Sequence, residues 1–276
     1  MKNMAGRSAL INVMFKAADA ASRRMMRDFG EVENLQVSRK GAADFVTRAD
    51  ITAEQTIQEE LSKARPDWGF IMEEGGTIEA SDPDQPMWII DPIDGTTNFT
   101  HGIPHFAISI AVMQAGKITA GLILDPSRNE CFFAETGKGA FMNERRIRVS
   151  GRRQMSDALF ATGIPFLGRG TVQSDERFIA ELNAVMKKSA GVRRFGAASL
   201  DLAWVAAGRY DGFWETGLSL WDIAAGHLIV REAGGFVSDF ASRDKALETG
   251  NIVAANSQLH TPLLKLLREG RDSLSS

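Results

Sequence analysis

Two aspartates that directly follow an apolar run are the residues of this sequence that first suggest chemistry. In PMWIIDPIDGTTNF, residues 86–99, Asp91 and Asp94 lie on either side of Pro92 and Ile93. The apolar letters before them predict a buried strand that delivers Asp91 at its carboxyl end, and Pro92 is expected to end that strand. A tight turn would then aim both carboxylates and the Ile93 carbonyl at one point. Oxygen ligands of this kind suit a hard divalent cation such as Mg²⁺.

The letters that follow Asp94 suggest a site for an anion. Gly95, Thr96 and Thr97 are predicted to open a helix. The first backbone N–H groups of a helix have no partner within it, and they lie at the positive end of its dipole. The N-terminus of a helix therefore commonly binds a phosphate.

A plainer interpretation stays open for this segment taken alone. Asp94 could be only a helix N-cap, and Asp91 only a turn residue at the end of a strand. Acidic residues at two other predicted element ends, Glu73 in IMEEGG and Asp222 in LSLWDIAAG, favour the cation site instead. Three separate places in the chain then supply ligands for the same ion.

The elements that must position these residues follow from the spacing of the apolar letters. Residues 10–30 place apolar side chains every three or four positions, which predicts a helix. Residues 37–50 read as a loop or irregular hairpin leading to Asp50, and Thr52 with Gln55 resembles a capping box that starts a second helix. WGFIMEE reads as a short strand that ends at Glu73.

In the rest of the chain the spacing of the apolar residues changes twice. Residues 105–126 and 131–143 alternate or run apolar between glycines, which predicts an antiparallel meander. After Val149, strand-like and helix-like segments alternate, which predicts an α/β part. We therefore expect an N-terminal α+β part with the metal motif, residues 1–149, packed tightly against a C-terminal α/β part, residues 150–276.

Composition narrows the classes of function. The net charge of −3 and a pI near 5.9 give no general electrostatic reason to bind nucleic acid or an anionic membrane. No window approaches the ~20 apolar residues of a membrane span, and the N-terminal segment lacks a signal-peptide core. The one cysteine, Cys131, lies in a predicted strand and reads as a buried, inert thiol. A soluble cytoplasmic protein is expected.

Two segments carry a resemblance to a known family. WIIDPIDGTTNF and WETGLSLWDIAAGHLIVREAGG resemble the paired signatures of the inositol monophosphatase family, and the second is most similar to the bacterial extragenic-suppressor-like branch. The resemblance runs from about Leu10 to Leu267. It implies a layered α/β/α/β/α sandwich of the sugar-phosphatase type and, usually, a homodimer. It also implies a lithium-sensitive phosphatase that uses two to three Mg²⁺ ions per site.

The resemblance assigns the metal ligands. Glu73, Asp91 and the Ile93 carbonyl would hold the first Mg²⁺. Asp91, Asp94 and Asp222 would hold the second. These ions would activate the attacking water and neutralise charge on the phosphoryl oxygens.

The resemblance also assigns the catalytic and binding residues. Thr96 and Asp50 would orient and deprotonate the attacking water. Glu73 would also be catalytic, because it holds a metal ion that takes part in the reaction. The backbone N–H groups of Gly95 and Thr96 would grip the phosphate. The residues implied for contact with the polyol are Asp94, Ala198, Glu215 and Asp222.

Several alternatives remain open at this stage. The leading substrate is myo-inositol 1-phosphate, but histidinol phosphate, fructose bisphosphate or a 3′-phosphonucleotide would use the same metal site. Ser219 stands where some family members have histidine, which puts substrate preference in doubt. The suppressor-like branch also suggests a transcription antitermination role with RNA polymerase or RNA as partner. The basic segments NERRIRVSGRRQ and KKSAGVRRF are the candidate surfaces for that role.

Overall fold

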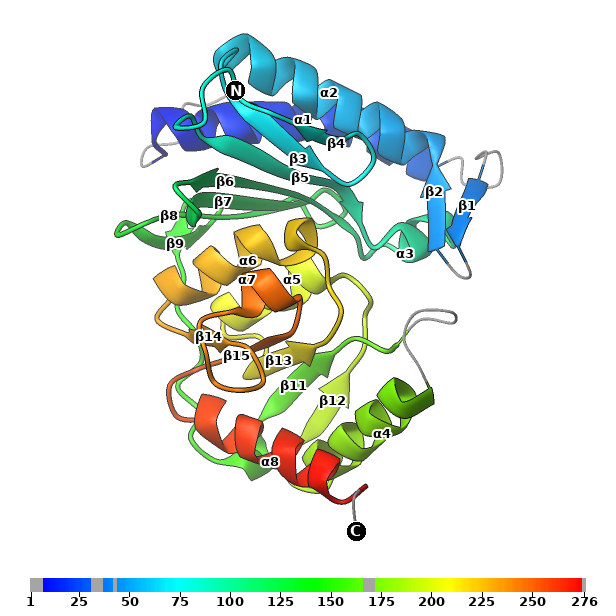
Figure 1. Ribbon diagram of the computed structural model, residues 1–276, viewed down its shortest axis with the longest axis vertical. Coiled ribbons are helices and arrows are strands. Elements are labelled where there is room, and N and C mark those ends of the chain that lie inside the picture. Colours follow the sequence, from blue (N-terminus) through cyan, green and yellow to red (C-terminus); the bar gives the residue numbers. More distant parts are fainter. Residues whose placement is uncertain (1–6, 31–36, 42–43, 166–171, 275–276) are drawn as a thin grey trace.

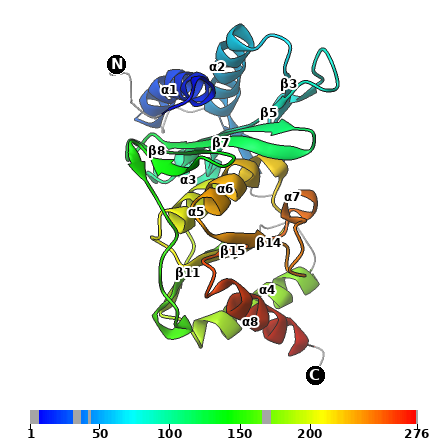
Figure 2. The ribbon, with the colours of Figure 1, turned by 90° about the vertical axis from the view of Figure 1, so that its left-hand side faces the viewer.

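Five layers of helix and sheet make up the computed structural model, which describes residues 7–30, 37–41, 44–165 and 172–274 (Figure 1). Helices α1 (Ala9–Phe29) and α2 (Arg48–Ala64) lie on the outer face of a first sheet. Helices α5 (Ala198–Ala206) and α6 (Leu220–Glu232) lie between this sheet and a second one, as the turned view shows (Figure 2). The expected α/β/α/β/α sandwich is confirmed.

Eight strands of the described residues form the first sheet, in the order β10-β9-β8-β7-β6-β5-β3-β4. Neighbouring strands are antiparallel except for β3 and β5, which run parallel. The predicted meander corresponds to β6 through β9. The bounds are β3 Gly69–Met72, β4 Gly76–Ile78, β5 Met87–Asp94, β6 Ala107–Gln114, β7 Lys117–Asp125, β8 Glu130–Glu135, β9 Gly139–Met142 and β10 Arg145–Arg146.

The second sheet has five strands in the order β12-β11-β13-β15-β14. Strand β11 runs parallel to both β12 and β13, whereas β15 is antiparallel to β13 and β14. Helices α4 (Val172–Met186) and α8 (His260–Asp272) form the last layer. The remaining bounds are β11 Leu159–Thr162, β12 Gly191–Arg193, β13 Gly212–Glu215, β14 Phe236–Ser238, β15 Ile252–Ala255, α3 Thr96–Thr100, α7 Ala246–Thr249, a 3₁₀ turn at Met155–Asp157, and a hairpin of β1 Val37–Gly41 with β2 Asp44–Thr47.

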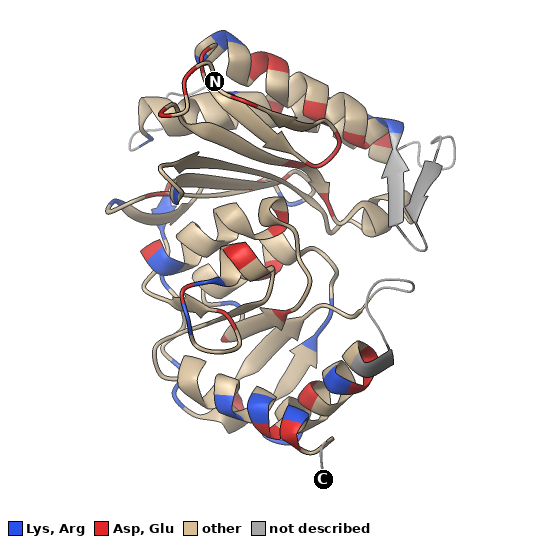
Figure 3. Cartoon of the chain, in the orientation of Figure 1, with Lys and Arg blue, Asp and Glu red and all other residues tan. Residues whose placement is uncertain are grey.

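The middle helices are apolar on most sides because a sheet covers each face of their layer. Almost every residue of α5 is buried, and so is a continuous run of α6 from Ile223 to Val230. Figure 3 shows charged residues spaced along the outer helices α2, α4 and α8, whereas α5 and α6 carry few. The expected division near residue 149 stays a prediction; that position lies between the last strand of the first sheet and the first strand of the second.

The start of α2 differs from the expectation. The helix begins at Arg48, directly after β2, so the predicted capping box at Thr52 is wrong. The Thr52 hydroxyl instead donates back to the Arg48 carbonyl at 2.7 Å, within the first turn. Asp50 therefore lies in the first turn of α2 rather than before it. In the described part of the chain, no helix is both long and apolar enough to cross a membrane.

Candidate active site

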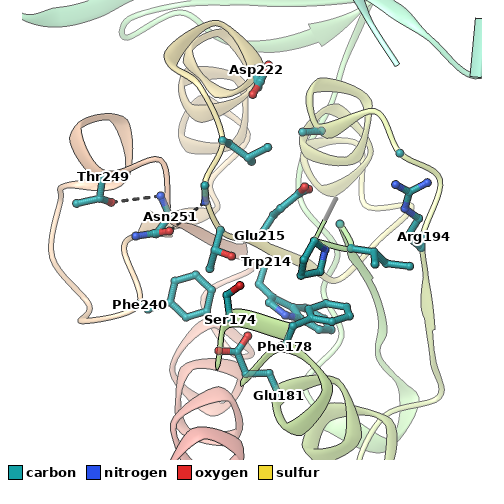
Figure 4. A pocket seen from close by; sticks show the side chains of 18 of the residues that line it. Ser174, Phe178, Glu181, Arg194, Trp214, Glu215, Asp222, Phe240, Thr249 and Asn251 are labelled. Atoms are coloured by element: carbon teal, nitrogen blue, oxygen red, sulfur yellow. Dashed lines mark hydrogen bonds between the residues drawn. The ribbon is translucent and has the colours of Figure 1, made fainter. Parts of the chain in front are cut away.

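A cavity of about 650 Å³ lies at the seam between the two halves of the chain. Strand ends and helix starts from both halves contribute to its wall, and Figure 4 shows part of it from close by. The predicted site residues that line it are Glu73, Asp91, Ile93, Asp94, Gly95, Thr96, Ala198, Glu215 and Asp222. Segments more than 100 positions apart in the sequence thus meet at one site.

Strand β5 carries the two aspartates, and it continues past Pro92 to Asp94. The expectation that Pro92 ends the strand is therefore wrong. The pairing with β6 shifts register between Asp91 and Asp94, and it resumes where Asp94 faces Ala107. Such an irregularity accommodates a proline, which has no N–H to donate to the ladder. Both aspartates are buried, at 1 % and 8 % exposure.

Gly95, not Asp94, is the N-cap of the short helix α3. Its φ of +94° lies in the region that favours glycine. A Cβ here would also approach the His105 carbonyl at 3.0 Å and the Ala197 Cβ at 3.3 Å. The simple N-cap role for Asp94 is thereby excluded, and its carboxylate is available for another role.

The surroundings of Asp91 fit a cation. Burial raises the pKa of Asp91 well above its usual range, and the nearby carboxylates of Glu73, Asp94 and Asp222 raise it further. Its Oδ1 is buried and has no hydrogen-bond partner among the described residues. Within those residues no three His, Cys, Asp or Glu side chains are already arranged as a metal centre. We call Glu73, Asp91, Asp94 and Asp222 the acidic set. Their carboxylates have the ligand chemistry for a divalent ion, and ion binding would have to draw them closer together.

Asp94 is held from the other half of the chain. Its Oδ2 accepts hydrogen bonds from the backbone N–H of Ser199 at 2.7 Å and from the Ser199 hydroxyl at 2.5 Å. Burial raises the pKa of Asp94, and these bonds, with others from the backbone of Ala198 and Leu200, oppose that rise. The start of α5 therefore orients Asp94. Sequence reasoning missed Ser199, because a serine at a helix start does not reveal which distant carboxylate it contacts.

Thr96 and Asp50 form the pair that the resemblance implied. The Thr96 hydroxyl lies 3.0 Å from Asp50 Oδ1 and 2.9 Å from the Ile93 carbonyl oxygen, so it can donate to either. Asp50 is 1 % exposed and reaches Thr96 from the first turn of α2. A water beside Thr96 would have a hydroxyl as acceptor and a carboxylate behind it.

The second half supplies the facing acids. Asp222 lies in the first turn of α6, where its Oδ2 accepts the backbone N–H of Ser219 at 2.7 Å. Glu215 ends β13 next to the buried Trp214. Burial raises the pKa of Glu215 to about 8, with further contributions from Asp222 and Asp94. Ser219 and Asp222 thus form a capping box, in which the Ser219 side chain in turn accepts the backbone N–H of Asp222.

The far end of the cavity was not predicted from the sequence. Helix α4 contributes Phe178 and Arg177 there, and the segment after β14 contributes Phe240, as the labelled rings in Figure 4 show. The sequence of α4 shows only the apolar spacing of a helix, which does not indicate that one face of this helix lines a cavity. The cavity consequently extends beyond the acidic end where the predicted residues gather.

Cys131 and His105 are both buried away from solvent. Burial raises the pKa of the Cys131 thiol to about 12, and the residue lies in β8, as predicted. His105 packs between the rings of Phe195 and Trp204, and burial followed by the charge of Arg128 lowers its pKa to about 4. His105 is therefore neutral in the folded protein near pH 7.

The sequence matches that of proteins from one known family. The model of the inositol monophosphatase family matches residues 7–271. An inositol-1-monophosphatase of Mesorhizobium japonicum is 56 % identical over 263 residues, which cover 95 % of this chain and 97 % of that protein. The Nus factor SuhB of Pseudomonas aeruginosa is 46 % identical and covers 94 % of this chain and 96 % of its own length.

A solved structure agrees with the same grouping. The crystal structure of the extragenic suppressor protein suhB from Bartonella henselae superposes with a TM-score of 0.91 at 52 % identity. The match covers 95 % of this chain and all of that one. The layers described above are thus those of a solved relative.

Proposed function

The chain belongs to the inositol monophosphatase family, and we propose that it hydrolyses myo-inositol 1-phosphate or a similar small polyol monophosphate with Mg²⁺. It is a phosphatase that acts on phosphate monoesters. Two relatives named inositol-1-monophosphatase are 56 % and 52 % identical to it over 95 % of its length, which supports this ester as the leading substrate. A homodimer in the cytoplasm is part of the same proposal.

The metal ligands in this proposal come from both halves of the chain. Glu73, Asp91 and the Ile93 carbonyl would hold one Mg²⁺, and Asp91, Asp94 and Asp222 a second, with a third ion possible in the acidic set. The buried Oδ1 of Asp91, which has no hydrogen-bond partner among the described residues, supports this assignment. When bound, these ions supply Lewis-acid chemistry at the phosphoryl and ester oxygens. Lithium sensitivity is expected from the family.

The chain's own groups would handle the proton and the phosphate. Thr96 Oγ1 would accept a proton from the attacking water as it passes its own proton to Asp50, which lies 3.0 Å away. The backbone N–H groups of Gly95 and Thr96 would bind the phosphate at the start of α3. Burial of Asp50 keeps this carboxylate away from bulk water, so its hydrogen bond to Thr96 is not lost to solvent competition.

The polyol would be bound by the second half. Glu215 and the backbone at Ala198 line the same cavity, with Asp94 and Asp222 beside them. A carboxylate can accept hydrogen bonds from two hydroxyl groups of a ring. We assign to Glu215 the discrimination of inositol from other esters, and Glu215→Gln should change the substrate ratio more than the rate on a simple aryl phosphate.

The observation that carries the proposal is that Thr96 lines the same cavity as Glu73, Asp91, Asp94 and Asp222, and that Asp50 lies 3.0 Å behind the Thr96 hydroxyl without lining the cavity itself. Its test is phosphate release from inositol 1-phosphate, histidinol phosphate, fructose 1,6-bisphosphate and 3′-phosphoadenosine 5′-phosphate, with and without Mg²⁺. The proposal requires a Mg²⁺-dependent preference for the inositol ester that Li⁺ suppresses. Weak, unselective release from all four would contradict it.

A second candidate function rests on the relatives named Nus factor SuhB. The segment 145–153 exposes Arg145, Arg146, Arg148, Arg152 and Arg153, and such a group can contact nucleic acid or an acidic protein. Co-elution of the purified protein with bacterial RNA polymerase would support it. A variant with Arg145, Arg146 and Arg148 changed to Ser should then lose co-elution and keep phosphatase activity.

A further inference from the structure

The glycine at position 163 lies directly against the carboxylate of Glu215. A Cβ built on Gly163 would meet Oε1 and Cδ of Glu215 at 1.9 Å and Oε2 at 2.3 Å. The three nearest atoms to that Cβ position all belong to this one carboxylate. The head group of Glu215 therefore occupies the space in which any other residue at position 163 would have its side chain.

The backbone at Gly163 does not itself require a glycine. Its φ lies outside the left-handed region, so an L-amino acid could adopt the same conformation. The glycine is accordingly needed for the space beside it rather than for a turn. Gly163 differs in this respect from Gly95, where φ and space both exclude a side chain.

Strand pairing explains why these two residues meet. Strands β11 and β13 run parallel, with Thr162 opposite Trp214. Gly163 and Glu215 each follow one position later. The Thr162 hydroxyl donates to the Trp214 carbonyl at 2.8 Å, which holds the two strand ends in register. On its other side Glu215 pairs with the buried Ile252 of β15. Glu215 thus lies between the end of β11 and strand β15, and its carboxylate occupies the space beside Gly163.

We propose that Gly163 is a specificity-determining residue, because its missing side chain forms the seat that holds the Glu215 carboxylate at the polyol end of the cavity. The proposal rests on the proposed function, in which Glu215 binds the polyol hydroxyls. A methyl group at position 163 would displace the carboxylate from its seat. The available direction is into the cavity, toward the like charges of Asp94 and Asp222 and into the space of the substrate ring.

A double-mutant cycle tests this seat. The variants are Gly163→Ala, Glu215→Ala and the two combined, and kcat and KM are measured for inositol 1-phosphate and for p-nitrophenyl phosphate. Gly151→Ala is the matched control, because a Cβ there meets no atom of the described residues within 4 Å and its φ is also outside the left-handed region. The unfolding midpoint of each variant is recorded without substrate.

Gly163→Ala should lower kcat/KM for inositol 1-phosphate at least about tenfold relative to the aryl ester, mostly through KM. In the Glu215→Ala background the same change should have no further effect on the ratio, since the clash is gone. The midpoint should fall for Gly163→Ala in the native background and recover in the double variant. Gly151→Ala should stay within about twofold of the native ratio.

The cycle separates failure of the seat from failure of the proposed function. The proposal that Gly163 makes room for the Glu215 carboxylate would be refuted in either of two ways. Gly163→Ala could keep the native substrate ratio and the native unfolding midpoint, or the effects of the two changes could be additive in the double variant. If Glu215→Ala leaves the substrate ratio unchanged while the midpoints still show the coupling, Gly163 seats the carboxylate but Glu215 does not read the polyol. That result refutes both the proposed role of Glu215 and the specificity role of Gly163.

Discussion

Replacing Ser199 with alanine would remove one of the two Ser199 hydrogen bonds that hold Asp94 Oδ2, and it would leave the backbone of α5 unchanged. The hydroxyl bond is 2.5 Å long, and Ser199 is fully buried. Asp94 would keep the backbone N–H of Ser199 at 2.7 Å but could rotate about it. Ser199 is thus a positioning residue for a proposed metal ligand.

The size of the effect follows from the charge of the acceptor. A buried hydrogen bond to a charged group contributes about 1.5–3 kcal/mol, so the metal-free protein should lose about 2 kcal/mol of its free energy of unfolding. For a chain of 276 residues that corresponds to a fall of roughly 3–4 °C in Tm. Loss of a partner that orients a ligating carboxylate typically weakens metal affinity about 10- to 100-fold.

Two measurements check these values. Calorimetric titration gives the Mg²⁺ affinity, and thermal unfolding in EDTA gives the stability without metal. Ser22→Ala is the matched control, because it removes a buried helical serine hydroxyl whose bond to the Asp19 carbonyl lies far from the cavity. If Ser199→Ala binds Mg²⁺ with native affinity and melts within a degree of the native protein, the hydroxyl does not position Asp94.

Three further predictions concern neighbouring residues. Asp91→Asn should lower phosphate release at least about a hundredfold, because a metal ligand worth several kcal/mol is lost, while Tm in EDTA rises as a buried like charge disappears; native activity would refute the metal assignment. Gly95→Ala should lower the free energy of unfolding in urea by about 1–3 kcal/mol, because φ at this position is positive, and an unchanged midpoint would contradict that strain. His105→Phe should make unfolding less sensitive to acid. The folded pKa of His105, about 4, lies below the unfolded value of about 6.5, so the native protein loses stability as pH falls through that window. Between pH 7 and 4.5 the variant should lose about 2–3 kcal/mol less than the native chain in urea titrations, and equal losses would show that His105 does not titrate there.

Local patterns in the sequence predicted most of the elements. The alternating letters of residues 105–126 correspond to β6 and β7, and the helical spacing from Leu10 corresponds to α1. Element ends were predicted less well. The start of α2 was placed at Thr52 instead of Arg48, because the threonine side chain bonds back within the helix instead of capping it. Strand β5 passes Pro92 because it carries one extra residue between Asp91 and Asp94 and then resumes its pairing with β6, which the sequence of β5 alone cannot show.

The sequence predicted the chemical groups of the candidate site but not the residues that hold those groups in place. The paired signatures identified the acidic residues, and the structure brings the predicted lining residues to one cavity. Ser199 and Gly163 were missed because their importance lies in what they contact. A serine at a helix start and a glycine after a strand are common in any sequence. Only the fold, which brings the start of α5 to the end of β5 and sets β11 beside β13, gives them a partner.

Amino-acid order by itself determined the period of each element and the positions of the acids, because burial of one face imposes a repeat on neighbouring letters and strand ends are marked by glycine, proline and charge. The tertiary structure decided which carboxylates share a site, how far their pKa values move, and where the cavity is empty. These properties depend on distances between residues that lie far apart in the chain. They arise only when the second half packs beneath the first sheet and buries Asp91, Asp94 and Glu215 together, where each charge acts on the others through a medium that screens poorly.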